Sequence, residues 1–128
     1  PQKLAFNAYL DFLHRHNHNF IRMWTWEHAT WDTTANGRWG KDKPHTVTPH
    51  PWNRTGPGKA LDGKPKFNLE QYNEEYFRRL RDRVIAAGRR GIYVSVMLFE
   101  GWAMQHMEGA WASHPFHRDN NVSGLTSE

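Results

Sequence analysis

The stretch "FIRMWTWE", residues 20–27, is short, apolar and aromatic, and it ends on a carboxylate. A run of this length and composition predicts a β-strand. Because side chains alternate along a strand, Ile21, Met23 and Thr25 share one face. The opposite face carries Phe20, Arg22, Trp24 and Trp26. Neither face has the polar residues expected against solvent, so the pattern predicts a strand of a parallel sheet that is covered on both sides.

A second strand, "IYVSVMLF" at residues 92–99, is the clearest in the chain and leads into Glu100, Gly101 and Trp102. Its positions are mostly apolar, which is typical of a buried strand. Both predicted strands therefore end beside a tryptophan and a glutamate.

Two helices accompany these strands. Residues 4–16 have helical spacing, and the helix is expected to end near residues 17–19 because asparagine tolerates a left-handed C-terminal position. Asn68 predicts the N-cap of a second helix that runs to Ala87, with Gly88 as its natural end. The apolar stripe of the first helix consists of Leu4, Ala5, Ala8, Tyr9, Phe12 and Leu13.

The segment from Glu27 to about Phe67 shows no convincing period. An irregular segment of about 40 residues far exceeds the usual limit of about 12–15 residues, so it is either functional or disordered. Three tryptophans, Trp31, Trp39 and Trp52, favour an ordered, packed loop. The tail after Trp102 is also loop-like.

The order helix, strand, long loop, helix, strand, long loop predicts an α/β protein with a parallel sheet. In a (β/α)8 TIM barrel the loops after the strands build the active site, and the unusual residues of this chain lie in those positions. Two strands cannot close a barrel, which typically takes about 250 residues. We therefore expect part of a barrel rather than a different, smaller α/β fold.

Composition excludes several classes of protein. The chain has 128 residues, 14% of them aromatic, with seven tryptophans, which argues against disorder. The net charge is +4, and the basic stretch Arg78–Arg90 is interpreted as a solvated helix face rather than a nucleic-acid site. The absence of cysteine excludes disulfides and thiolate metal sites, and no apolar run approaches the about 18 residues of a membrane span. The sequence leaves the compartment open.

Three stretches carry a resemblance to a known family: "YLDFLHRHNHNFIRMWTWE", the segment "PHPWNRTGPGKALDGKPKFNLEQYNEEYFRRLRDRVIAAGRRGIYVSVMLFEGW", and "HPFHRDNN". Together they resemble bacterial glycoside hydrolases of the cellulase-like, clan A type (family 5-like), which are (β/α)8 barrels. The resemblance implies that residues 1–128 are part of a catalytic domain that is incomplete at both ends. It also implies that "FIRMWTWE" is the second barrel strand and "IYVSVMLFEG" the third.

The same resemblance implies that the catalytic residues lie elsewhere. Such enzymes retain anomeric configuration, and their proton donor is the glutamate of an Asn-Glu pair after the fourth strand, with a nucleophilic glutamate after the seventh. The Asn73–Glu74 step lies inside the predicted second helix, so it cannot be that pair. Arg22 matches a position where many members of the family have an arginine that hydrogen-bonds the nucleophile. We therefore expect Arg22 to support catalysis rather than perform it.

Candidate residues for the substrate gather at the strand ends. Trp26 and Trp102 offer flat faces for sugar rings, whereas Trp24 is assigned to the core. Glu27 and Glu100 are expected to bind hydroxyl groups or support the loops, and an acid/base pair formed by these two is the less favoured interpretation.

Further candidates come from the loops. The proline- and glycine-rich stretch Pro49–Lys59 supplies His50, Trp52 and Arg54, which either line sugar subsites or belong to a rigid structural loop. His114 is a further candidate substrate contact. His14, His16 and His18 do not share one helix face, so they are not expected to bind a metal. No cofactor is expected either.

The sequence thus predicts a fragment of a retaining glycoside hydrolase acting on O-glycosidic bonds of a poly- or oligosaccharide. Its expected partners are the carbohydrate substrate and the rest of the barrel, with no nucleic acid and no membrane. One alternative is a non-catalytic carbohydrate-binding protein that uses the tryptophan-rich loops. Another is a basic nucleic-acid-binding domain, which would bind with strong salt dependence.

Overall fold

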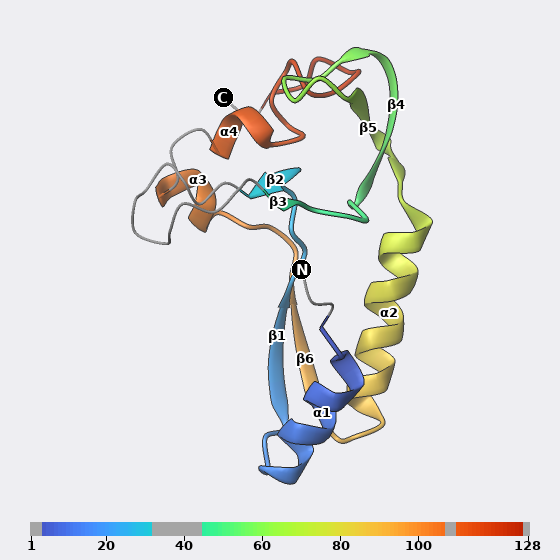
Figure 1. Cartoon of the computed structure of the whole chain (residues 1–128), viewed down its shortest axis with the longest axis vertical. Coiled ribbons are helices and arrows are strands. Elements are labelled where there is room, and N and C mark those ends of the chain that lie inside the picture. Colours follow the sequence, from blue (N-terminus) through green and yellow to red (C-terminus); the bar gives the residue numbers. More distant parts are fainter. Residues whose placement is uncertain (1–3, 32–44, 107–109, 127–128) are drawn as a thin grey trace.

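The computed structural model describes residues 4–31, 45–106 and 110–126. Strands β1 (Phe20–Trp24) and β6 (Tyr93–Met97) pair in parallel, with Phe20 opposite Tyr93 and Trp24 opposite Met97. Helices α1 (Phe6–Arg15) and α2 (Glu74–Gly88) lie beside this pair (Figure 1). The predicted α/β class and the parallel pairing of the two strands are confirmed.

The apolar core lies between the two helices and one face of the β1–β6 pair. Its buried members are Leu10, Leu13, Ile21, Ala87 and Ile92. The predicted stripe of the first helix is only partly right, because α1 buries Leu10 completely while Leu4, Tyr9 and Phe12 are exposed. Asn17 has φ of 57°, so the expected left-handed end of the helix is confirmed.

The opposite face of the β1–β6 pair is uncovered in the described part of the chain. Phe20, Trp24 and Tyr93 on this face are 55%, 45% and 73% exposed. Within the described residues this face is therefore not covered as predicted, and Trp24 lies outside the apolar core. Aromatic residues on one face of a strand indicate that this face is suited to burial, but they do not show which segment covers it.

A β-hairpin occupies much of the segment for which an irregular loop was predicted. Strand β4 (Trp52–Lys59) pairs antiparallel with β5 (Pro65–Tyr72), and β2 (Thr30–Trp31) pairs antiparallel with β3 (His45–Thr46). Register shifts interrupt the β4–β5 ladder, which erases the alternation that reveals a strand in sequence. The side chain of Trp31, and Trp39 as a whole, lie outside the described residues.

Helix α2 begins five residues later than predicted. Asn73 is its N-cap, and Oδ1 of Asn73 accepts a hydrogen bond from the amide of Glu75 at 3.1 Å. Asn68 makes the same contact with the amide of Glu70 at 3.0 Å, but it lies within β5. The local capping signal is thus present twice, and pairing in the hairpin decides which one starts the helix. Glu74 is consequently the first helical residue rather than an interior one.

We expect Asn73→Ala to lower the free energy of unfolding by about 1 kcal/mol, because the amide of Glu75 loses its acceptor at the helix start. Urea unfolding followed by circular dichroism measures this. Asn7→Ala, at an exposed position within α1, is the control and should change stability by less than about 0.5 kcal/mol. Equal effects of the two substitutions would contradict the assigned cap.

The tail contains two short helices, α3 (Trp102–His106) and α4 (Ala110–Ser113), where a loop was predicted. They lie near β2 and β3, beyond the carboxyl ends of β1 and β6 (Figure 1). Among the described residues, no helix combines the length and apolar character needed to cross a membrane.

Candidate functional site

The carboxyl ends of β1 and β6 are joined beyond the regular ladder. The amide of Thr25 donates to the carbonyl of Met97 at 3.0 Å. Oγ1 of Thr25 lies 2.5 Å from the carbonyl oxygen of Met97 and 2.7 Å from that of Leu98, so its hydroxyl donates in this direction. These bonds fix the separation of the two chains as they enter their loops, and they bring Glu27 next to Glu100.

Glu27 and Glu100 form the centre of a buried polar cluster. Oε2 of Glu27 accepts a hydrogen bond from the amide of Glu100 at 3.0 Å, and the two residues are 2% and 5% exposed. Nε2 of His114 lies 3.6 Å from Oε2 of Glu27, and Nε2 of His28 lies 3.2 Å from Oε2 of Glu100. The cluster therefore joins the loops after both strands to the segment that follows α4.

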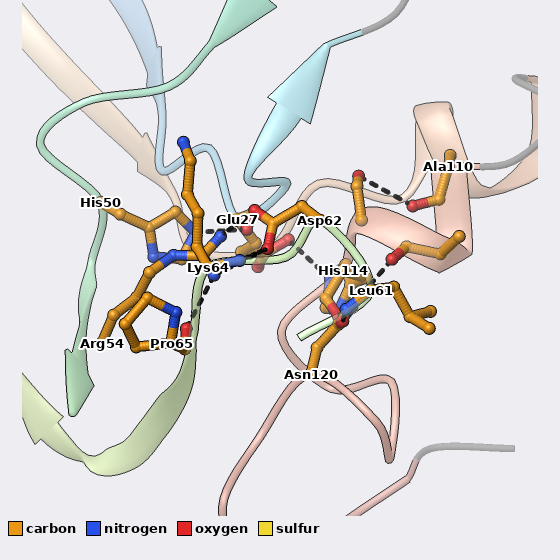
Figure 2. Close-up of polar contacts among 12 residues, drawn as sticks. Glu27, His50, Arg54, Leu61, Asp62, Lys64, Pro65, Ala110, His114 and Asn120 are labelled. Carbon is orange, nitrogen blue, oxygen red and sulfur yellow. Dashed lines mark hydrogen bonds and ion pairs between the residues drawn. The ribbon is translucent and has the colours of Figure 1, made fainter. Parts of the chain in front are cut away.

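Two His-Pro-aromatic segments, residues 50–52 and 114–116, approach Glu27 in similar ways. In each, Nδ1 of the histidine accepts the backbone amide of the aromatic residue, at 3.3 Å from Trp52 and 3.1 Å from Phe116. Nε2 of His50 donates to the backbone carbonyl of Glu27 at 2.6 Å. Figure 2 shows His50 and His114 reaching Glu27 from two sides. The rings of Trp52 and Phe116 contact each other at a centroid distance of 5.4 Å.

Asn120 connects the turn of the β4–β5 hairpin to the segment that carries His114. Its Nδ2 donates to the carbonyls of Ala112 at 2.8 Å and His114 at 2.9 Å, while its Oδ1 accepts the amide of Leu61 at 2.9 Å (Figure 2). Asn120 is 2% exposed, so these bonds satisfy groups that water does not reach. Sequence reasoning missed Asn120, since nothing local distinguishes it from a surface asparagine.

His28 is the other member that sequence reasoning missed. It is 1% exposed, and its Nδ1 lies 3.3 Å from the carbonyl of Ala110, to which it donates. The only available signal was its position directly after Glu27, at the end of a predicted strand. Within the described part of the chain, its Nε2 makes no hydrogen bond of acceptable geometry despite the short distance to Glu100.

Burial lowers the pKa of two histidines of the cluster, His50 and His28. Desolvation lowers the pKa of His50 to about 4, against the opposing effect of its backbone hydrogen bonds to Glu27 and Trp52. Desolvation also lowers the pKa of His28, and the neighbouring His114 lowers it further. Both imidazoles are therefore neutral at pH 7. Oε1 of Glu27 is buried and has no hydrogen-bond partner among the described residues.

The lowered pKa of His50 makes folding stability depend on pH. The unfolded chain binds a proton near its ordinary pKa of 6.5, while the folded chain does not until about 4, so stability is present above 6.5 and is lost as the pH falls. We expect the free energy of unfolding to fall by about 2 kcal/mol between about pH 6.5 and 5 from this residue. Urea titrations at both values measure it; His50→Gln should reduce the slope and exposed His18→Gln should not. An unchanged slope in His50→Gln would contradict this account.

A pocket of about 290 Å³ lies beside the cluster, under the hairpin. His50, Trp52 and Arg54, three of the predicted substrate contacts, contribute to its wall. The Arg54 guanidinium is engaged within the hairpin, where it pairs with Asp62 through both terminal nitrogens and lies 3.9 Å from the ring centre of Phe67. The polar wall is completed by Asn53, Lys64, Asn73 and Glu75.

The structure brings four predicted residues together and separates others. Glu27, His50, Glu100 and His114 meet in the cluster, with at most 8% exposure each. Trp26 is partly buried and its ring lies 5.7 Å from that of His28, whereas Trp102 is 41% exposed at the start of α3. Arg22 is exposed on the uncovered face of β1, away from the described cluster.

Metal binding finds no support in the described residues, where no three His, Cys, Asp or Glu side chains are arranged to hold an ion. In His50 and His114, Nδ1 accepts a backbone proton, so the proton of the neutral ring resides on Nε2. His14, His16 and His18 are exposed.

Comparisons with protein-family models, with curated proteins and with solved structures find no match for this chain.

Proposed function

We propose that the chain is part of the (β/α)8 barrel of a retaining glycoside hydrolase, in which it builds one wall of the saccharide cleft. The observation that carries this proposal is the meeting of Glu27 and Glu100 at the carboxyl ends of two adjacent parallel strands. Barrel enzymes build their active sites from the loops at this end of the sheet.

The uncovered face of the β1–β6 pair also supports a barrel. Parallel sheets are normally covered on both faces, and a two-stranded sheet is marginal without further packing. Phe20, Trp24 and Tyr93 are large aromatic side chains on this face, and each is at least 45% exposed in the described structure. In a closed barrel this face points inward, where side chains from the other strands fill the interior.

The cluster at the strand ends is suited to support rather than to chemistry. A catalytic carboxyl group must reach the scissile bond or a water molecule beside it. Oε2 of Glu27 is held by the amide of Glu100, and both glutamates are almost fully buried. We therefore assign Glu27 and Glu100 to loop positioning, and assign the two catalytic carboxylates of the enzyme to other strands.

The surface offered to sugar consists of Trp102 and the pocket that holds Trp52. We expect a soluble β-linked oligosaccharide to quench or shift tryptophan fluorescence in the purified chain, because sugar rings stack on exposed aromatic faces. Trp102→Ala should remove at least about 1 kcal/mol of binding free energy, and calorimetric titration measures it. Trp24→Ala is the matched control, since Trp24 is 45% exposed against 41% for Trp102 but lies on the uncovered sheet face. Equal losses in both variants, or no response to any of a panel of saccharides, would overturn the proposal.

A non-catalytic carbohydrate-binding protein is the second candidate, favoured by the polar pocket under the hairpin. Both candidates predict saccharide binding without hydrolysis of an aryl glycoside by this chain. They differ at the uncovered face: a barrel wall leaves an apolar surface that binds a hydrophobic dye, and Tyr93→Lys should weaken that binding. A chain that binds saccharide but no dye would show that Phe20, Trp24 and Tyr93 are covered in solution, which removes this support for a barrel wall and leaves the second candidate.

A further inference from the structure

The two His-Pro-aromatic segments hold the same residue, Glu27, although they lie far apart in the sequence. His50 donates to the backbone carbonyl of Glu27, and His114 lies 3.6 Å from its carboxylate. Pro51 and Pro115 are both buried, and the aromatic residues that follow them contact each other. Four parts of the chain thus meet here: the loops after β1 and β6, the segment before β4, and the segment after α4.

Both histidines have a hydrogen-bond pattern that only a neutral ring can satisfy. Nδ1 accepts a backbone amide proton in each, from Trp52 and from Phe116. A second proton on the ring must go to Nδ1, where it would face another N–H group. At His50, whose Nε2 faces a backbone carbonyl rather than a carboxylate, protonation therefore exchanges a hydrogen bond for a contact between two donors, at a site where water does not compensate.

We propose that Glu27, His50 and His114 form a proton-sensitive clasp, which holds the segments at residues 47–52 and 114–122 against the strand ends when His50 is neutral and releases them when His50 is protonated. The clasp is independent of any saccharide and of the enzyme class. Its residues position the loops and take no part in bond cleavage.

The charged and titratable groups around the clasp oppose protonation of His50 more than they favour it. Burial lowers the pKa of His50 to about 4, its backbone hydrogen bonds to Glu27 and Trp52 oppose this shift, and Arg54 and His114 add to it. Tyr76 of α2 faces Glu27, and burial raises the pKa of its phenol, so it remains neutral. His28 and His114 differ from His50, because Nε2 of each faces a carboxylate, that of Glu100 at 3.2 Å and that of Glu27 at 3.6 Å. The rings of His28 and His114 also contact each other, at a centroid distance of 5.0 Å.

Amide hydrogen exchange measured by NMR tests the clasp in the unmodified chain. After correction for intrinsic rates, the amides of Trp52 and Phe116 are expected to exchange at least about tenfold faster at about pH 4.5 than at about pH 7.5. The amide of Tyr93, bonded to the carbonyl of Asn19 at 2.8 Å, reports on the β1–β6 core and should stay protected. Simultaneous loss of protection at all three amides, or no change at any, would overturn the proposal.

Substitutions distinguish opening of the clasp from a general loss of stability at low pH. His50→Gln and His114→Gln keep a donor toward Glu27, but they remove the Nδ1 acceptor and cannot take a proton. Exchange at the amide of Trp52 in the first variant, and of Phe116 in the second, should therefore be fast and independent of pH. His117 is the matched control, because its Nδ1 also accepts an amide two residues on, that of Asp119 at 3.2 Å, but its side chain is 18% exposed. His117→Gln should leave the response at Trp52 and Phe116 intact.

The ring tautomers give a readout that needs no variant. Nitrogen chemical shifts at about pH 7.5 should show both rings neutral with the proton on Nε2. A charged ring, or a proton on Nδ1 in either histidine, would contradict the clasp.

Discussion

Glu27→Ala is expected to lower the free energy of unfolding by about 1–3 kcal/mol, because it leaves a buried donor without its acceptor. This donor is the amide of Glu100, bonded at 3.0 Å, and the substitution also removes the carboxylate that lies 3.6 Å from Nε2 of His114. The loss is partly offset, since Oε1 of Glu27 is itself buried without a partner among the described residues. Urea unfolding followed by tryptophan fluorescence measures the change.

Two controls define the origin of this effect. Glu27→Gln keeps an acceptor oxygen of the same reach, so it should cost less than half as much as the alanine substitution. Glu70→Ala removes an exposed glutamate from β5 and should stay within about 0.5 kcal/mol of the wild-type value. If Glu27→Ala were as mild as Glu70→Ala, the clustered loops would not depend on Glu27.

Leu10→Ala is expected to destabilise the chain by about 2–5 kcal/mol, because it opens a cavity between α1 and the β1–β6 pair. Leu10 is 0% exposed and packs in the same cluster as Ile21 and Ile92. Thermal and urea unfolding measure the change. Leu4→Ala is the matched control, since Leu4 is 64% exposed just before the same helix, and it should have little effect. Equal costs at the two positions would show that α1 does not pack as described.

The parts of the fold that the sequence predicts are those with an uninterrupted local period. Residues 20–24 and 93–97 form strands, and their parallel pairing follows from the helical segment between them. The β4–β5 hairpin was not predicted because its register shifts and its Pro and Gly residues hide the alternation of a strand. Asn68 and Asn73 offer equal capping signals, so the start of α2 depends on tertiary pairing.

In the candidate site, the meeting of Glu27 and Glu100 could be predicted from the sequence, but their burial could not. Glu27 and Glu100 meet because the carboxyl ends of adjacent parallel strands lie at one edge of the sheet. Their burial was not predictable, because it depends on His50 and His114, which arrive from loops with no period. Whether such residues contact a sugar or each other is decided by tertiary packing, which a single sequence does not encode locally.

All of the proposals depend on β1 and β6 running side by side in parallel, with Glu27 beside Glu100 where the strands end. Nuclear Overhauser contacts in the isotope-labelled chain test this most directly. The account predicts cross-peaks between the backbone protons of Met23 and Val96, and between the Glu100 amide proton and the side-chain protons of Glu27. An antiparallel pattern of cross-peaks, or a Glu100 amide with no contact to Glu27, would contradict it.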